Sequence, residues 1–117
     1  MAKKKILVID DQPEILDILS EIIEILGHEV HAITTGNDLE KIFDVHDIDI
    51  VISDYQMPDM TGYDIAKIIK DKYPKVKVYI VSGYHSVLSD EKMVKYGVCG
   101  LLDKPFKMDE LKEILKD

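Results

Sequence analysis

Five polar residues that could bind a metal ion or a phosphate each follow a short apolar run of the sequence. They are Asp10, Asp11, Asp54, Ser82 and Lys104. Three carboxylates that share one site repel one another, so at neutral pH they either take up a proton or attract a cation. Because the ligands on offer are oxygen atoms, a hard ion such as Mg²⁺ is favoured. A cation, an ammonium and a hydroxyl around one carboxylate suit phosphoryl transfer onto that carboxylate.

The runs that precede these residues predict an alternating series of strands and helices. Strands are expected at 5–9, 29–34, 48–53, 77–81 and 100–102, and helices at 13–26, 36–45, 63–72, 87–96 and 108–115. Short, apolar strands that alternate with amphipathic helices indicate a parallel sheet covered on both faces. We therefore predict an α/β fold, a (βα)5 doubly wound five-stranded parallel sheet with the flavodoxin-like strand order 2-1-3-4-5.

The predicted sheet explains why the polar residues could form one site. Ligands of open α/β sheets bind outside the carboxyl ends of the strands, near the point where the strand order reverses. All five polar residues follow strands at that edge. Asp54 follows the central strand, so the Asp10–Asp11 pair can flank it from one side and Ser82 and Lys104 from the other. Asp54 is therefore the expected nucleophile, and an aspartyl phosphate the expected covalent product.

The ordered set of motifs resembles the receiver domain of two-component response regulators, including those of the CheY type. It consists of Asp10-Asp11, Asp54-Tyr55-Gln56-Met57-Pro58-Asp59-Met60-Thr61-Gly62, Ser82-Gly83 and Lys104-Pro105-Phe106. A lone Asp-Asp pair or Lys-Pro pair has little value, but the whole set in this order, each at a strand end, is specific. The resemblance spans essentially the whole chain.

The resemblance implies that Asp54 accepts a phosphoryl group from a histidine kinase or a histidine phosphotransfer protein, which switches partner binding in phosphorelay signalling. It implies that Asp11, Asp54 and the backbone carbonyl of Gln56 coordinate Mg²⁺, or Mn²⁺ in its place, with Asp10 acting largely through water. Ser82 would turn its hydroxyl toward the phosphoryl oxygen, and Lys104 would pair with the phosphoryl group. Such a domain is a phosphoprotein rather than an enzyme, with at most slow self-dephosphorylation.

One position departs from the family's pattern. Three residues before the lysine, where the family often has a Tyr or Phe that swings inward on phosphorylation, this chain has Leu101. An aliphatic side chain cannot act as that aromatic switch. Coupling from Ser82 to the partner-binding face is therefore expected to work differently.

Two other functions compete with the receiver. A phosphohydrolase of the haloacid-dehalogenase type also uses a nucleophilic aspartate with Mg²⁺, but it carries Asp-x-Asp after the first strand, whereas this chain has adjacent aspartates followed by Gln12-Pro13. The second alternative is a receiver-like scaffold that is never phosphorylated. Asp10 and Asp11 could also simply cap the first helix, since Asp is a good N-cap residue.

Composition narrows the range of partners. The 117 residues carry a net charge of −8, and all 15 basic residues are lysines, so nucleic-acid binding by this domain is not expected. No apolar run reaches the roughly 18 residues of a membrane span, and the N-terminal apolar stretch is too short for a secretory signal. We expect one cytoplasmic receiver domain over residues 1–117, monomeric or dimeric on phosphorylation, with a stand-alone form weakly favoured over a piece of a longer regulator or hybrid kinase.

The remaining candidates are predicted to be structural. The single cysteine, Cys99, lies in an apolar context and is expected to be a buried, inert thiol. His28 and His31 straddle a helix end and a strand, so a metal pair there is not expected, and His46 and His85 stand alone.

The first helix carries more apolar residues than one stripe needs. Its core stripe is predicted at Ile15, Leu19, Ile22 and Leu26, with a docking surface around Gln12, Ile15 and Leu16 as the alternative use of its start.

Overall fold

The computed structural model describes residues 3–83, 90–103 and 107–116, so Lys104 and His85 lie outside the described residues. In the described part of the chain, five parallel strands form one sheet: β1 (Lys5–Ile9), β2 (Glu29–Ile33), β3 (Ile50–Asp54), β4 (Lys77–Ser82) and β5 (Val98–Asp103). Their order is β2-β1-β3-β4-β5, which confirms the predicted topology. The helices are α1 (Pro13–Ile25), α2 (Leu39–Val45), α3 (Gly62–Lys72), α4 (Asp90–Tyr96) and α5 (Met108–Leu115).

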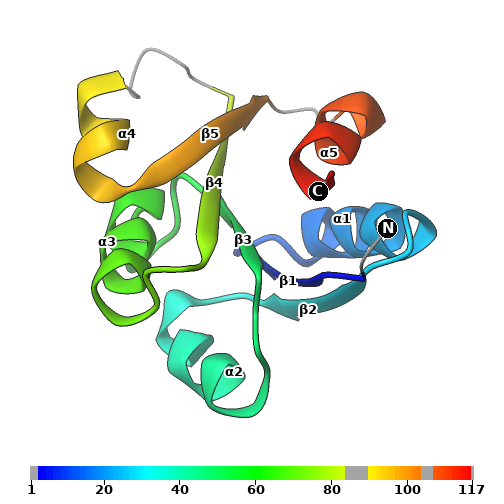
Figure 1. Cartoon of the computed structure of the whole chain (residues 1–117), viewed down its shortest axis with the longest axis horizontal. Helices are drawn as coiled ribbons and strands as arrows, with labels where there is room; N and C mark the ends of the chain where they lie inside the picture. Colours follow the sequence, from blue (N-terminus) through cyan, green and yellow to red (C-terminus); the bar gives the residue numbers. More distant parts are fainter. Residues whose placement is uncertain (1–2, 84–89, 104–106, 117) are drawn as a thin grey trace.

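The helices divide into two layers, one on each face of the sheet. Helices α1 and α5 lie on one face, and α2, α3 and α4 lie on the other (Figure 1). Successive residues of a strand point to opposite faces, so Ile6 and Val8 pack with α1 and α5, while Leu7 and Ile9 pack on the α2–α3 side. Because both faces are covered, all five residues of β3 are buried. This explains why the strands read as continuous apolar runs.

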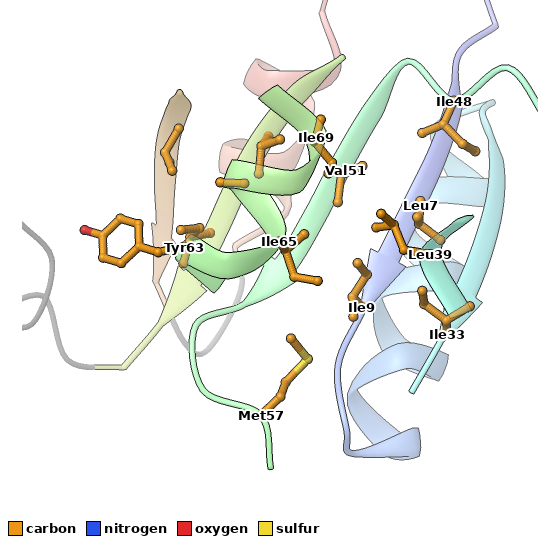
Figure 2. Close-up of a cluster of buried hydrophobic side chains, with 14 residues drawn as sticks. Leu7, Ile9, Ile33, Leu39, Ile48, Val51, Met57, Tyr63, Ile65 and Ile69 are labelled. Carbon is orange, nitrogen blue, oxygen red and sulfur yellow. The ribbon is translucent and has the colours of Figure 1, made fainter. Parts of the chain in front are cut away.

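The hydrophobic core on the α2–α3 side is drawn in Figure 2. Leu7 and Ile9 of β1 lie close to Leu39 of α2, and Ile65 of α3 faces the sheet. Met57, which belongs to the loop after β3, reaches into the same cluster and is only 8% exposed. A loop that follows Asp54 is thus anchored in the core.

Some boundaries differ from the prediction for local reasons. The expected helix at 36–45 is split into a 3-10 turn, η1 (Gly36–Asp38), and α2, because the Thr35 hydroxyl accepts a hydrogen bond from the N–H of Asn37 and starts a tight turn. Strand β3 begins two residues later than expected and includes Asp54. Within the described segments, none of the helices has both the length and the apolar content that a bilayer crossing requires.

The expectation that Cys99 is buried is wrong. Val78 pairs with Val98 and Tyr79 pairs with Gly100, so Cys99 is skipped where the register of β4 and β5 shifts. Since β5 is an edge strand, the skipped residue turns outward, and Cys99 is exposed. The apolar neighbours in sequence gave no sign of this irregularity.

The stripe that helix α1 buries against the sheet shares only Leu19 with the predicted one. Its buried residues are Leu16, Leu19 and Ile23, whereas Ile15, Ile22 and Leu26 are half-buried. Leu16 is only 5% exposed, so it cannot belong to a docking surface. Apolar residues cover so much of the helix circumference that periodicity alone leaves the centre of the stripe undetermined.

The two isoleucines at the end of α1 give a matched test of this packing. Ile23 is fully buried, and Ile25 is 74% exposed. We expect Ile23→Ala to lower the free energy of unfolding by about 2–5 kcal/mol, because it removes apolar contacts and leaves a cavity. We expect Ile25→Ala to change it by less than about 0.5 kcal/mol. Urea unfolding of both variants followed by circular dichroism measures the difference, and equal effects would contradict the observed packing.

Candidate functional site

The site begins with two adjacent strands that end side by side. Ile9 of β1 is paired with Ser53 of β3, so the next residues along the two strands, Asp10 and Asp54, lie beside each other. By the alternation of side chains, both point to the face covered by α1 and α5. Neighbouring strands are about 4.8 Å apart. The strand register therefore forces two carboxylates together at the carboxyl edge of the sheet.

Asp11 completes a cluster of three acids. Asp10, Asp11 and Asp54 each offer one carboxylate oxygen, and these oxygens all lie within 4.8 Å of one another. Asp10 and Asp54 are 2% and 8% exposed, while Asp11 is open to solvent. Buried like charges at this spacing are unfavourable unless a cation or proton compensates them. The three carboxylates lie together as expected, and their all-oxygen donor set fits a hard divalent ion.

The turn that leads into α1 fixes Asp10. Its Oδ1 atom accepts a hydrogen bond of 2.9 Å from the N–H of Gln12. Gln12 is the N-cap residue of α1 and Pro13 is the first helical residue, so neither aspartate occupies the cap position itself. The capping alternative for the Asp10–Asp11 pair is therefore wrong, although Asp10 does order the turn before the helix.

The loop after Asp54 is closed by backbone hydrogen bonds. The N–H of Tyr55 donates to Val81 O at 2.9 Å, and the N–H of Gly62 donates to Tyr55 O at 2.7 Å. Gln56 pairs with Thr61 in an isolated antiparallel bridge. Together with the buried Met57, these bonds hold Tyr55 and Gln56 at the edge of the site.

Gly62 has a role that the sequence analysis missed. A Cβ atom on Gly62 would lie 3.1 Å from the carbonyl oxygen of Asp54 and 3.2 Å from the side chain of Ile80. Glycine here allows the start of α3 to approach the backbone of the acidic residue closely. Thr61 and Asp64 form a capping box directly around it, with Asp64 Oδ2 accepting a hydrogen bond of 2.9 Å from the N–H of Thr61.

Ser82 and the carboxylates of Asp11 and Asp54 line one pocket of about 210 Å³. The pocket is lined by Asp11, Gln12, Asp54, Tyr55, Gln56, Ser82 and Gly83. It is smaller than the roughly 300–1,000 Å³ typical of sites for drug-sized ligands, so a small group suits it. Ser82 is paired with Asp103 at the ends of β4 and β5. Asp10 lies beside this pocket in the acidic cluster. Lys104 lies outside the described part of the chain.

Leu101 stands at the position where the family often has an aromatic switch residue. Three tyrosine rings pack in the same core cluster as Leu101. Leu101 is half-buried on β5 and packs against the core on the α2–α3 side. The ring of Tyr63 meets that of Tyr55 edge-on, with centroids 5.7 Å apart, and lies 5.1 Å from that of Tyr96 on α4. These contacts connect the residue after Asp54 to α4. No spacing pattern in the sequence signals them, because the three rings come from separate elements.

The chain is similar to known proteins over nearly its whole length. The family model described as the response regulator receiver domain matches residues 6–116. The chain is 33% identical over 110 residues to the DNA-binding transcriptional regulator NtrC of Proteus hauseri, covering 94% of this chain and 23% of NtrC. It is 28% identical to the regulatory protein AtoC of Escherichia coli, covering 98% of this chain and 25% of AtoC. The chain thus spans about a quarter of the length of these relatives.

Solved structures show the same fold. The response regulator TrrA of Thermotoga maritima, solved in complex with Mg²⁺-BeF, superposes with a TM-score of 0.85 at 33% identity and covers 97% of this chain and 96% of its own. The chemotaxis response regulator CheY4 of Vibrio cholerae superposes with a TM-score of 0.87 at 26% identity and covers 98% of both chains.

The close approach at Gly62 leads to a test with a matched control. Gly62→Ala should lower the free energy of unfolding by about 1–3 kcal/mol, because the added methyl group presses on the Asp54 carbonyl and on Ile80. Gly83→Ala at the same pocket should be neutral or slightly stabilising, since nothing lies within 4 Å of its added Cβ. Thermal unfolding of the two variants provides the measurement. A Gly62→Ala variant as stable as the parent would show that this contact is not tight.

Proposed function

Because the chain belongs to the response regulator receiver domain family, we propose that it is a phosphoacceptor of two-component signalling and that Asp54 is the residue phosphorylated. One observation carries the assignment. Asp54 ends the central strand, is buried, opens into a pocket shared with Ser82, and has carboxylate oxygens of Asp10 and Asp11 within 4.8 Å. We propose that the chain is a signalling domain and not an enzyme in its own right.

The proposed reaction uses Asp54 as the nucleophile. A carboxylate oxygen of Asp54 forms a bond to phosphorus while the bond from phosphorus to the donor's imidazole nitrogen breaks. The electron pair of that bond stays on the imidazole, which then takes up a proton. Ser82 stands in the pocket wall, where its hydroxyl can donate to a phosphoryl oxygen. Lys104 is proposed as the positive partner of the same phosphoryl group.

Asp11, Asp54 and the backbone carbonyl of Gln56 are proposed to hold Mg²⁺, with Asp10 acting largely through water. The donor set supports this proposal, because the clustered groups are all oxygen ligands. Bound Mg²⁺ supplies positive charge that offsets the charge of the phosphoryl oxygens, and Mn²⁺ is the expected substitute. The relative TrrA, solved with Mg²⁺-BeF, gives independent support. The hydrogen bond from the N–H of Gln12 to Asp10 Oδ1 orders the turn between β1 and α1, which carries Asp11.

The family and the larger size of the relatives indicate which kinds of protein this chain works with. We propose that a histidine kinase or a histidine phosphotransfer protein donates the phosphoryl group. One relative is the hybrid signal transduction histidine kinase L of Dictyostelium discoideum, and another is the regulator NtrC, so receivers like this one serve different larger proteins. We propose one receiver domain over residues 1–117, a monomer that can dimerise when phosphorylated, in the cytoplasm and without nucleic-acid contacts of its own.

Phosphorylation of Asp54 can be tested with a small phosphoryl donor. Incubation with acetyl phosphate and Mg²⁺ should add one phosphoryl group to the parent chain, detected by intact-protein mass spectrometry. Asp54→Asn should abolish the mass shift, because the amide is not a comparable nucleophile. The control Asp59→Asn, an exposed residue of the loop after β3, should retain it.

The same experiment separates the alternatives. Continuous release of phosphate with no stable mass shift would indicate the phosphohydrolase. No reaction with acetyl phosphate or with a phosphorylated histidine phosphotransfer protein would indicate the scaffold. A mass shift that survives in Asp54→Asn would contradict the choice of acceptor.

Metal binding at the acidic cluster can be tested by thermal unfolding. Mg²⁺ should raise the Tm of the parent chain, because an ion that binds only the folded state stabilises it. Asp11→Asn should lose most of this rise and should have a higher Tm than the parent without Mg²⁺, since one of three mutually repelling charges is gone. The control Asp17→Asn on the exposed side of α1 should respond to Mg²⁺ like the parent. An unchanged Mg²⁺ response in Asp11→Asn would rule out Asp11 as a ligand.

A further inference from the structure

A second group of metal-type ligands lies away from the acidic cluster. Glu29 and His31 belong to β2, and His46 follows the end of α2. Their ligand atoms, one from each residue, all lie within 4.8 Å of one another. The sequence analysis treated His46 as isolated, and that interpretation is wrong, because β2 and the end of α2 meet in the fold. We propose that Glu29, His31 and His46 form a Zn²⁺-binding site.

Strand geometry brings the first two ligands together. Glu29 and His31 are two residues apart on β2, so their side chains leave the same face, the one covered by α2. His31 Nε2 lies 2.8 Å from Glu29 Oε2, and both side chains are partly exposed, at 23% and 35%. This pair is already within bonding reach of a common ion and remains open to solvent.

The third ligand is fixed by the end of α2. The backbone N–H of His46 donates to Ile42 O at 2.9 Å, and His46 O accepts from the N–H of Ile48 at 3.2 Å. The imidazole of His46 stacks on that of His31, with ring centroids 3.9 Å apart and planes inclined by 28°. The backbones of both histidines are thus held in place. Binding then requires only side-chain rotation to bring nitrogen atoms to the separation of about 3.3 Å that tetrahedral Zn²⁺ ligands have.

The chemistry of the donors selects the ion. Two imidazoles and one carboxylate suit Zn²⁺, with water or another ligand at the fourth position, whereas Mg²⁺ prefers an all-oxygen set. The hydrogen bond to His31 holds the pKa of Glu29 below its ordinary value, and the positive charges of Lys5 and Lys3 act in the same direction against the effect of burial. Glutamate carboxylates are ordinarily ionised at neutral pH, as metal ligands must be. The same two lysines weaken the attraction for a cation, so a moderate affinity is expected.

A purely structural role is the alternative. The His31–Glu29 hydrogen bond and the stacked rings could simply close the edge of the sheet beside α2. In that case the cluster would bind protons but no metal ion. The two interpretations differ in what Zn²⁺ does to particular histidine side chains, and the chain contains only four histidines.

The test is a Zn²⁺ titration of the full chain in excess Mg²⁺, at a pH above the ordinary imidazole pKa of about 6.5. Calorimetry should show one Zn²⁺ per chain. In NMR spectra the imidazole signals of His31 and His46 should shift, while the buried His28, whose Nδ1 accepts from the N–H of Lys4, should not. His46→Gln and Glu29→Gln should each lower the affinity by at least about tenfold, and the exposed control Glu21→Gln should not change it.

Three results would overturn the proposal. One is the absence of Zn²⁺ binding in a parent chain whose cooperative thermal unfolding shows that it is folded. Another is Zn²⁺ binding that is unchanged in both His46→Gln and Glu29→Gln. The third is binding that is lost in Asp11→Asn but kept in His46→Gln, which would place Zn²⁺ in the acidic cluster. Circular dichroism of each variant establishes that a lost signal reflects a lost ligand and not an unfolded chain.

Discussion

Repulsion between carboxylates at the carboxyl edge of the sheet is the constraint on which the site depends. Adjacent parallel strands place Asp10 and Asp54 side by side, and Asp11 adds a third charge within 4.8 Å. Such a cluster lowers the stability of the fold unless positive charge is present. The same repulsion makes this edge of the sheet sensitive to binding, because any ion or phosphoryl group that enters it changes the electrostatic energy of the three carboxylates.

The remainder of the fold holds this unfavourable cluster in place. All five residues of β3 are buried between two helical layers, so the strand that carries Asp54 cannot move away easily. Met57 anchors the following loop in the core, and the hydrogen bond from Gly62 to Tyr55 closes it. Apolar burial on both faces thus offsets the cost of charge at one edge. The cost is local, whereas the compensation is spread over the whole domain.

The sequence was sufficient for the α/β fold, which follows from the alternation of apolar strands with amphipathic helices, and for the acidic cluster, which follows from where the strands end. Apolar runs end at Asp10 and Asp54, and parallel strands bring such ends together whatever the side chains between them. Prediction failed where a single residue's position depended on packing. Cys99 is exposed because the register shifts beside it, and Leu16 is buried because of how α1 turns on the sheet. The contact of His31 with His46 also escaped notice, since no short sequence pattern links a strand to the end of the next helix.

Donor chemistry keeps the two clusters of ligands distinct. The acidic cluster lies at the carboxyl ends of β1 and β3, whereas Glu29 is the first residue of β2 and His46 precedes β3, at the opposite ends of the strands. One cluster offers only oxygen atoms, and the other offers two imidazoles and one carboxylate. A hard ion therefore gains little from the histidine cluster. Zn²⁺ can bind carboxylates as well as imidazoles, so its preference for the histidine cluster must come from the two nitrogen ligands. If that preference holds, the edge at β2 and α2 can be stabilised without occupying the site where phosphoryl transfer is proposed, because the two clusters share no ligand.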